Sequence, residues 1–198
     1  MKIALVIIFL CLLEKSMFAQ ESIADCVKNI FIKSDSLNAL GKHPFDEWKV
    51  CVLGKPMPGF SAASISGDLV EMQNLKGKVV VINFWFIDCA PCIAELPGMN
   101  KLARKYRNKN VELLAITWES PGRIKEEFLV KYKLDFTIIP VAMKLINKII
   151  ASGYPTTFIT DESGIIQSAW NGGSTGESAG AEFYEKAKPV LDKLLNKK

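Results

Sequence analysis

The sequence predicts an α/β domain whose mixed sheet has parallel central strands, an antiparallel edge and flanking helices. Three patterns support this fold class. Apolar runs typical of buried strands alternate with segments of helical spacing, as they do in parallel sheets. Two short strand patterns then flank a tight turn near the end of the chain, which indicates a hairpin. A last helix with one apolar face completes the domain, and 198 residues provide for one such domain plus an extension.

The first 19 residues have the pattern of a signal peptide. Lys2 begins a short basic region, residues 3–13 form an apolar stretch, and Ala19 supplies a small residue at the expected cleavage site. The apolar stretch is too short to span a bilayer comfortably. The sequence therefore predicts export, with an uncleaved membrane anchor as the alternative.

Residues 20–53 are expected to form an N-terminal extension, and residues 54–198 the main domain. Within the extension, apolar side chains at helical spacing predict a short amphipathic helix over residues 21–33. Residues 35–48 contain glycine, proline and several polar side chains, and are expected to be irregular. A dense group of glycines and prolines at 54–59 marks the start of the main domain.

Turn residues and apolar runs place the elements of the main domain. Pro97 should kink one predicted helix, and Pro189 should kink the last helix or delay its start. The predicted strands are residues 60–65 and 69–72 as an N-terminal hairpin, 78–86, 111–118 and 136–141 within the sheet, and 156–160 with 165–170 as a second hairpin. The predicted helices are residues 93–106, residues 121–132 and a C-terminal helix whose apolar face includes Phe183 and Leu195.

Charge and cysteine content limit the classes of function. The net charge of +4 is small and the basic residues are scattered, which gives little support to nucleic-acid binding. Five cysteines are present, one of them in the predicted signal peptide. The others are an even set in a chain predicted to be exported, where disulfides persist; they are Cys26, Cys51, Cys89 and Cys92.

Cys89 and Cys92 form a C-x-x-C pair between a predicted buried strand and the helix that follows it. Two thiols at this spacing can close a disulfide, and the helix start stabilises negative charge on one of them. This pattern predicts thiol–disulfide exchange. Half of a metal site and an inert structural bridge are the alternatives. A zinc site would need more ligands, and His43, the single histidine of the chain, is distant in sequence.

Two separated motifs resemble one known family. Residues 81–92, together with Glu95-Leu96-Pro97, resemble the active-site strand and helix of exported TlpA/ResA-type thioredoxin-like reductases. Residues 153–158, Gly-Tyr-Pro-Thr-Thr-Phe, are similar to the cis-proline loop of that family. The similarity extends over roughly residues 54–196.

The resemblance implies a thioredoxin fold and a dithiol that reduces disulfides of exported proteins, without a cofactor or metal. Cytochrome c maturation is one task of known relatives. It also implies a periplasmic location, protein disulfide substrates and an upstream thiol electron donor. Membrane contact is expected only if the N-terminal segment stays uncleaved.

The resemblance also assigns roles to individual residues. Cys89 is expected to be the nucleophile and Cys92 the resolving thiol that releases the substrate. The peptide bond before Pro155 is expected to be cis, with Tyr154 in contact with the substrate; an ordinary turn before a strand is the alternative. Trp85 is expected to line the site, as a substrate contact or as part of the core.

The sequence offers Glu119 as a candidate for proton transfer. Glu119 follows predicted strand 111–118, at the edge of the sheet expected to carry the active site. It could move protons for Cys92, or it could be a solvated carboxylate or a helix cap. Asn83 and Ala90 stand where some relatives have acidic residues, and neither can take a proton.

Asp88 directly precedes the first cysteine of the pair, where thioredoxins commonly have an aromatic residue. Its negative charge should oppose thiolate formation at Cys89 if the side chain points inward. The alternatives are that Asp88 faces solvent or caps the helix.

Cys26 and Cys51 bracket the predicted extension. In an oxidising compartment they could pair and tie the first helix to the start of the main domain. Closing a loop of this length contributes roughly 3 kcal/mol in the chain-entropy model. A second redox pair or two free thiols are the alternatives.

Two other functions use the same fold. A thiol peroxidase would carry a threonine three residues before its reactive cysteine, where this chain has Phe86. A non-catalytic binding or metal-chaperone module would need histidine or methionine near the cysteines; Met99 is close in sequence, whereas His43 is not.

Overall fold

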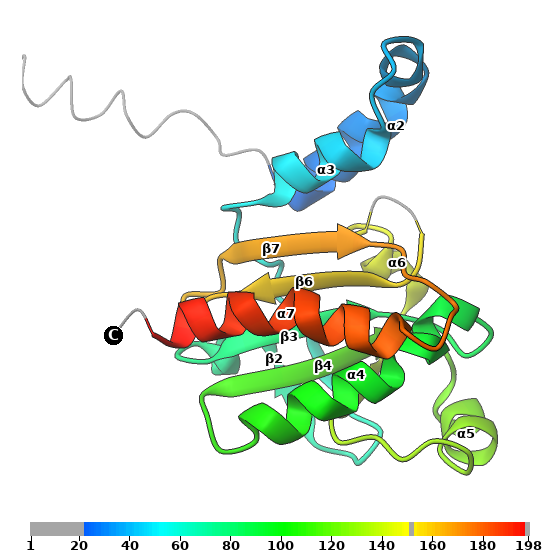
Figure 1. The fold of residues 1–198 in the computed structure, drawn as a ribbon, viewed down its shortest axis with the longest axis vertical. Helices are drawn as coiled ribbons and strands as arrows, with labels where there is room; N and C mark the ends of the chain where they lie inside the picture. Colours follow the sequence, from blue (N-terminus) through cyan, green and yellow to red (C-terminus); the bar gives the residue numbers. More distant parts are fainter. Residues whose placement is uncertain (1–21, 151–152, 197–198) are drawn as a thin grey trace, which may run out of the picture.

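The computed structural model describes residues 22–150 and 153–196, and its centre is a five-stranded mixed sheet. The strand order across the sheet is β5-β4-β3-β6-β7 (Figure 1). The strands are β3 (Val79–Phe84), β4 (Val111–Thr117), β5 (Thr137–Pro140), β6 (Thr156–Thr160) and β7 (Ile166–Asn171).

The directions of the strands confirm the predicted mixed sheet. Strands β3, β4 and β5 are parallel to one another, whereas β6 pairs antiparallel with β3 and β7 antiparallel with β6. Every residue of β3 is buried, because side chains on both faces of this central strand meet other elements. This explains why its sequence is a continuous apolar run rather than an alternating pattern.

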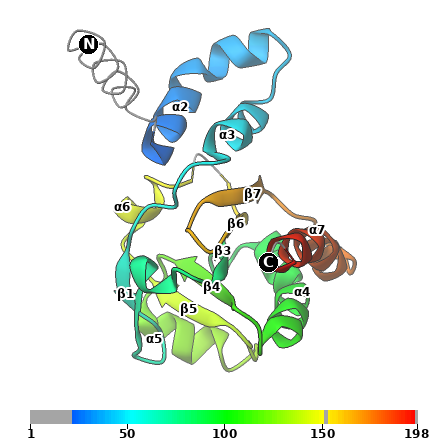
Figure 2. The same ribbon diagram turned by 90° about the vertical axis from the view of Figure 1, so that its left-hand side faces the viewer.

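One face of the sheet is covered by α4 (Ala90–Tyr106) and α7 (Ala179–Leu195), which lie side by side (Figure 2). The two helices touch at a pair of glycines: a Cβ added to Gly98 would overlap the carbonyl oxygen of Gly180. Backbone therefore packs on backbone at this crossing. Both helices continue through their internal prolines, so α7 does not have the delayed start that was one alternative.

The extension forms two helices, α2 (Ile23–Ala39) and α3 (Pro44–Val52), which stand beside β7 (Figures 1 and 2). A disulfide joins Cys26 of α2 to Cys51 of α3. Trp48 of α3 is 1% exposed and packs edge-on against Phe158 of β6, with ring centroids 5.4 Å apart. The extension and the sheet thus share one apolar core.

The prediction that residues 35–48 are irregular was wrong. Helix α2 runs to Ala39, and α3 already begins at Pro44. Proline suits a first helical position because its missing N–H would have had no partner there. The ring nitrogen Nδ1 of His43 caps this helix by accepting from the backbone N–H of Phe45 at 3.4 Å. Only the short turn through Gly41 is irregular.

Other elements differ in detail from the predictions. Helix α4 starts at Ala90, three residues earlier than expected, because Cys89 acts as its N-cap. The predicted helix 121–132 is a short α5 (Pro121–Arg123) followed by one π-helical turn, η3 (Ile124–Phe128). The predicted N-terminal hairpin is present as β1 (Ser61–Ala63) and β2 (Leu69–Glu71), with η2 (Met72–Leu75) after it; the short α6 (Met143–Ile146) was not predicted.

None of the helices in residues 22–150 and 153–196 combines the length and the apolarity that crossing a bilayer requires. The predicted signal peptide, residues 1–19, lies outside the described residues.

Candidate active site

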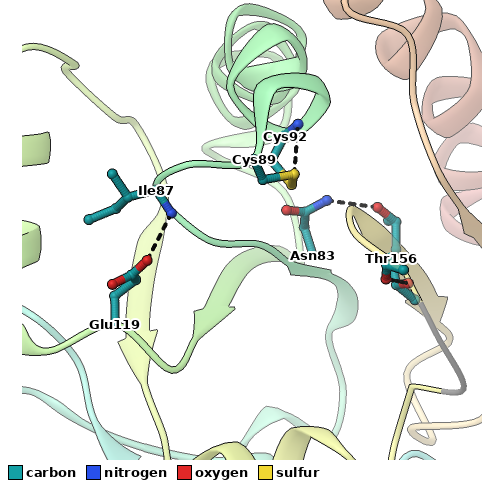
Figure 3. The surroundings of a disulfide bond; sticks show 8 residues. Asn83, Ile87, Cys89, Cys92, Glu119 and Thr156 are labelled. Carbon is teal, nitrogen blue, oxygen red and sulfur yellow. Dashed lines mark hydrogen bonds between the residues drawn. A yellow bond between two sulfur atoms is a disulfide. The ribbon is translucent and has the colours of Figure 1, made fainter.

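Three loops meet at one edge of the sheet and build the site (Figure 3). Cys89 follows the end of β3, and Glu119 follows the end of β4, which runs parallel to β3. Pro155 precedes β6, whose antiparallel direction brings its first residue to the same edge. Strand direction therefore gathers residues that lie up to 66 positions apart in the chain.

The C-x-x-C pair is closed as a disulfide between Cys89 and Cys92. Cys89 is the N-cap of α4, and its sulfur accepts a hydrogen bond from the backbone N–H of Cys92 at 3.3 Å (Figure 3). The two residues are 5% and 2% exposed. When the bond is reduced, the same amide and the helix dipole favour a thiolate on Cys89.

The loop before β6 contains a cis peptide bond between Tyr154 and Pro155. Gly153 has a φ of +76°, a conformation that glycine adopts without strain. The hydroxyl of Thr156 donates to the carbonyl of Gly153 at 2.9 Å and closes the turn. A Cβ at Gly153 would lie 3.9 Å from the ring of Phe45, so helix α3 of the extension reaches this loop.

Three aromatic rings pack together at the site, and two of them, Phe86 and Tyr154, border the apolar cluster that contains both cysteines. Phe86 lies 4.8 Å from Trp118 and 5.3 Å from Tyr154, and Trp118 lies 4.9 Å from Tyr154. All three are partly exposed, and burial raises the pKa of Tyr154 to about 12, so its phenol stays neutral. These rings offer an apolar surface next to the cysteines.

Trp85 does not share this surface. It is 1% exposed and packs against Phe128, with ring centroids 4.5 Å apart. The expectation that Trp85 contacts a substrate therefore needs correction: its side chain belongs to the core beneath the site. Sequence reasoning missed Trp118, which reaches the surface because it stands just past the end of β4.

Glu119 anchors the loop that leads into Cys89. Its Oε1 accepts from the backbone N–H of Ile87 at 3.1 Å (Figure 3), and both of its oxygens accept from the guanidinium of Arg123. The residue is 6% exposed. Both oxygens of Glu119 are therefore engaged in holding the loop. This arrangement argues against the proton-transfer role considered for Glu119.

A second buried acid, Glu95, was quoted from the sequence only as part of the Glu95-Leu96-Pro97 motif, with no role assigned to it. It lies in α4 one turn beyond Cys92, is 4% exposed, and its Oε2 has no hydrogen-bond partner. Burial raises the pKa of Glu95 to about 8, although Lys186 and the amide of Asn83 act in the opposite direction. The sequence did contain a signal for the burial of Glu95: helical spacing places it on the same face of α4 as Cys92 and Met99.

Asn83 occupies the floor of the site, where its side chain lies close to the disulfide (Figure 3). Its Nδ2 donates to Thr157 Oγ1 of the neighbouring strand at 2.9 Å, and the residue is 2% exposed. The amide thus links β3 to β6 below the cis-proline. Across the described part of the chain, no three histidine, cysteine or acidic side chains are grouped so as to hold a metal ion.

The sheet order, the disulfide at the start of α4 and the loop before β6 define a thioredoxin-fold protein. A family model described as the AhpC/TSA family matches residues 53–169, and the chain belongs to this family. The thiol-disulfide oxidoreductase ResA of Halalkalibacterium halodurans is 36% identical over 139 residues, which cover 69% of this chain and 77% of that protein.

Other relatives agree with this placement. The thiol-disulfide oxidoreductase ResA of Bacillus cereus is 35% identical over 113 residues, 57% of this chain and only 65% of that relative's length. Solved structures share the fold: a thiol:disulfide interchange protein of the thioredoxin family from Chlorobium tepidum aligns with a TM-score of 0.57 at 22% identity, over 71% of this chain and 96% of that one. Another from a Bacteroides species has a TM-score of 0.58 at 18% identity, covering 71% and 90%.

Proposed function

We propose that this protein is a thiol–disulfide oxidoreductase that reduces disulfides of exported proteins. The observation that carries the proposal is the bonded pair Cys89–Cys92 at the start of α4, beside the cis peptide bond before Pro155. The relatives named thiol-disulfide oxidoreductase add support. No bound cofactor is needed, because both electrons are held by the two sulfurs.

The reaction follows from the positions of the two sulfurs. In the reduced protein, the Cys89 thiolate attacks one sulfur of a substrate disulfide, and the other substrate sulfur leaves as a thiolate that takes up a proton. Cys92 then loses its proton and attacks Cys89. The Cys89–Cys92 bond forms, the second substrate sulfur leaves, and it too is protonated. The substrate gains two electrons and two protons, one proton from Cys92 and one from solvent. A donor dithiol later restores two electrons and one proton to the protein.

We assign the proton of Cys92 to Glu95 in place of Glu119. Glu95 is buried one turn further along the same helix, and its Oε2 has no hydrogen-bond partner. Its raised pKa, about 8, lets it exchange a proton near neutral pH. Glu119 instead holds the loop before Cys89 through its contact with Ile87.

Substrate binding falls to the cis-proline loop and the rings around it. The backbone of Tyr154 next to the cis bond can pair with an extended peptide segment. The rings of Phe86 and Trp118 would cover apolar side chains that flank the substrate cysteine. An open groove of about 450 Å³ next to Trp118 and Glu119 continues this surface.

The setting of the protein is part of the same proposal. Residues 1–19 would direct export to the periplasm, residues 20–53 form the extension, and the thioredoxin-like domain starts at residue 54. Its partners would be protein disulfides and an upstream thiol donor. Substrates in cytochrome c maturation would suit this location.

A trapping experiment tests the proposed reaction. With Cys92→Ser, the second attack cannot occur, so Cys89-linked mixed disulfides should accumulate in the periplasm and disappear on treatment with a thiol. The matched control is Cys89→Ser, which leaves no nucleophile and should trap nothing. Failure of Cys92→Ser to yield any thiol-sensitive adduct would contradict the mechanism.

A thiol peroxidase is the second candidate, because the matching family model carries the AhpC/TSA name and peroxidases share this fold. The aromatic ring of Phe86 three positions before Cys89 argues against it, since peroxidases use a threonine hydroxyl at that place. Reduced protein should therefore consume hydrogen peroxide no faster than the Cys89→Ser variant, while reducing insulin disulfides.

A further inference from the structure

Arg123 joins three carboxylates beside the first cysteine. Its Nη2 lies 2.8 Å from Oδ2 of Asp88, its Nη1 lies 2.9 Å from Oε2 of Glu119, and its Nε lies 3.1 Å from Oε2 of Glu127. The Arg123 side chain is 34% exposed. A guanidinium presents several donors in a fixed plane, so it can hold several acidic partners at once.

The contacts of Arg123 converge on the loop that precedes the nucleophile. Asp88 is the residue immediately before Cys89, and Ile87 before it donates its N–H to Glu119 at 3.1 Å. Glu119 in turn receives two hydrogen bonds from Nη1 of Arg123. Arg123 therefore holds Asp88 directly. It also holds Glu119, which in turn binds the backbone of Ile87.

The same contacts place a positive charge next to Asp88. Alone, a carboxylate adjacent to Cys89 would disfavour a second negative charge on the sulfur. The pair with Arg123 offsets it, although the 70% exposure of the Asp88 side chain weakens the interaction through solvent screening. Charged and titratable groups on the elements at the site are Asp88 on the loop of Cys89, Glu119, Arg123 and Glu127 after β4, Glu95 on α4, Tyr154 on the cis-proline loop, and Lys186 and Glu182 on α7, which act on Glu95.

We propose that Arg123 is a positioning residue for the dithiol: it fixes the loop of Ile87 and Asp88 and offsets the charge of Asp88, so that reduced Cys89 is held as a thiolate. The inference rests on the proposed function and deepens it. Reduction of the Cys89–Cys92 bond by a donor dithiol adds two electrons and one proton, and it yields a thiolate on Cys89 and a thiol on Cys92. Arg123 favours this product over the disulfide.

The test is Arg123→Gln, which keeps a polar side chain but removes the charge. Arg123→Gln removes the positive charge that lies 2.8 Å from Asp88, the residue before Cys89. This loss should raise the pKa of the Cys89 thiol and lower the equilibrium constant for reduction about fivefold. That factor corresponds to a potential about 20 mV more negative. The pKa is read from the pH dependence of alkylation of Cys89 by iodoacetamide, and the potential from equilibration with glutathione.

Three further variants make the outcome specific. Asp88→Asn combined with Arg123→Gln should lose less than Arg123→Gln alone, because the repelling carboxylate is gone. Arg123→Lys should recover part of the loss, since it restores the charge without the fork of donors. Arg104→Gln is the matched control: it removes an exposed arginine paired with Asp135 on the surface, and it should leave both readouts unchanged.

Equal pKa and potential in Arg123→Gln and Arg104→Gln would overturn the proposal. So would an Arg123→Gln effect that the added Asp88→Asn change does not reduce. Neither result would affect the proposed function, whose failure shows separately as the absence of Cys92→Ser adducts. The unfolding transition of Arg123→Gln is measured before the redox experiments, to verify that the variant is folded.

Discussion

At the scale of single residues, the two buried acids of the site differ in their hydrogen bonds. Sequence reasoning considered only one of them, Glu119, as a proton carrier. Glu119 follows the end of β4, which made it a candidate from the sequence, yet its oxygens accept hydrogen bonds from Arg123 and from the N–H of Ile87. Glu95 lies inside a helix, and its Oε2 is buried without a partner. Burial without full hydrogen bonding makes the charged form costly, which is the property a proton carrier near neutral pH requires.

Glu95→Gln should change the pH dependence of stability. The pKa of Glu95 is about 8 in the folded protein against an ordinary value of 4.5, so the folded state binds this proton more tightly. Its contribution is fully present below about pH 4.5 and is lost as pH rises through 8. Glu95→Gln removes the cost of ionisation, and at pH 8 the variant should be more stable than the wild type by about 4 kcal/mol.

Urea unfolding of the oxidised protein at pH 5 and pH 8 measures this difference, which should be small at pH 5. Glu185→Gln is the matched control, because Glu185 is an exposed helical glutamate and its removal should give equal changes at both pH values. A pH-independent effect of Glu95→Gln would mean that the carboxyl is ionised normally in the fold.

At the scale of elements, the packing of α4 on α7 sets where the cysteines lie. The start of α4 carries Cys89, and its position relative to the sheet depends on the close crossing at Gly98 and Gly180. Because backbone meets backbone there, no side-chain rearrangement can make room for an added group. The crossing therefore fixes the helix that positions the active site.

Gly98→Ala should strongly destabilise the fold. The added methyl group would overlap the carbonyl of Gly180, so the two helices must separate, at a cost of about 3 kcal/mol or more. Denaturant unfolding measures the loss. Gly59→Ala is the control, because no heavy atom lies within 4 Å of its added Cβ, and its effect should stay within about 0.5 kcal/mol. Equal effects of the two changes would show that α4 and α7 are not closely packed.

At the scale of the whole molecule, the extension is part of the core that supports the site. Trp48 is buried against Phe158 of the sheet, and Phe45 lies near Gly153 in the cis-proline loop. The Cys26–Cys51 disulfide fastens α3, which makes these contacts, to α2. Its position, joining two helices that pack on each other, favours a structural bridge over a second redox pair.

Replacing both Cys26 and Cys51 by alanine should lower stability while leaving the chemistry intact. The bond closes a loop of 25 residues in sequence separation, and its loss should reduce the free energy of unfolding by about 3 kcal/mol. Insulin reduction below the unfolding transition should continue at a rate near that of the wild type. A loss of turnover in the folded double variant would instead assign the pair a redox role.

The sequence by itself determined the mixed sheet, the C-x-x-C pair at a strand-to-helix junction and the two hairpins. These features follow from local patterns: apolar runs, turn residues and the spacing of the cysteines. Local rules failed where signals competed. In residues 35–48, glycine and polar side chains concealed the helix start at Pro44.

Only the tertiary structure decided which side chains surround the sulfurs. Trp85 and Trp118 both lie near strand ends, yet one is enclosed by the core and the other meets Phe86 and Tyr154 at the surface. The link from Arg123 to Asp88 spans 35 residues and depends on two parallel strands ending at one edge. Such contacts join residues distant in the chain, and their burial and charge are set by packing rather than by any local pattern.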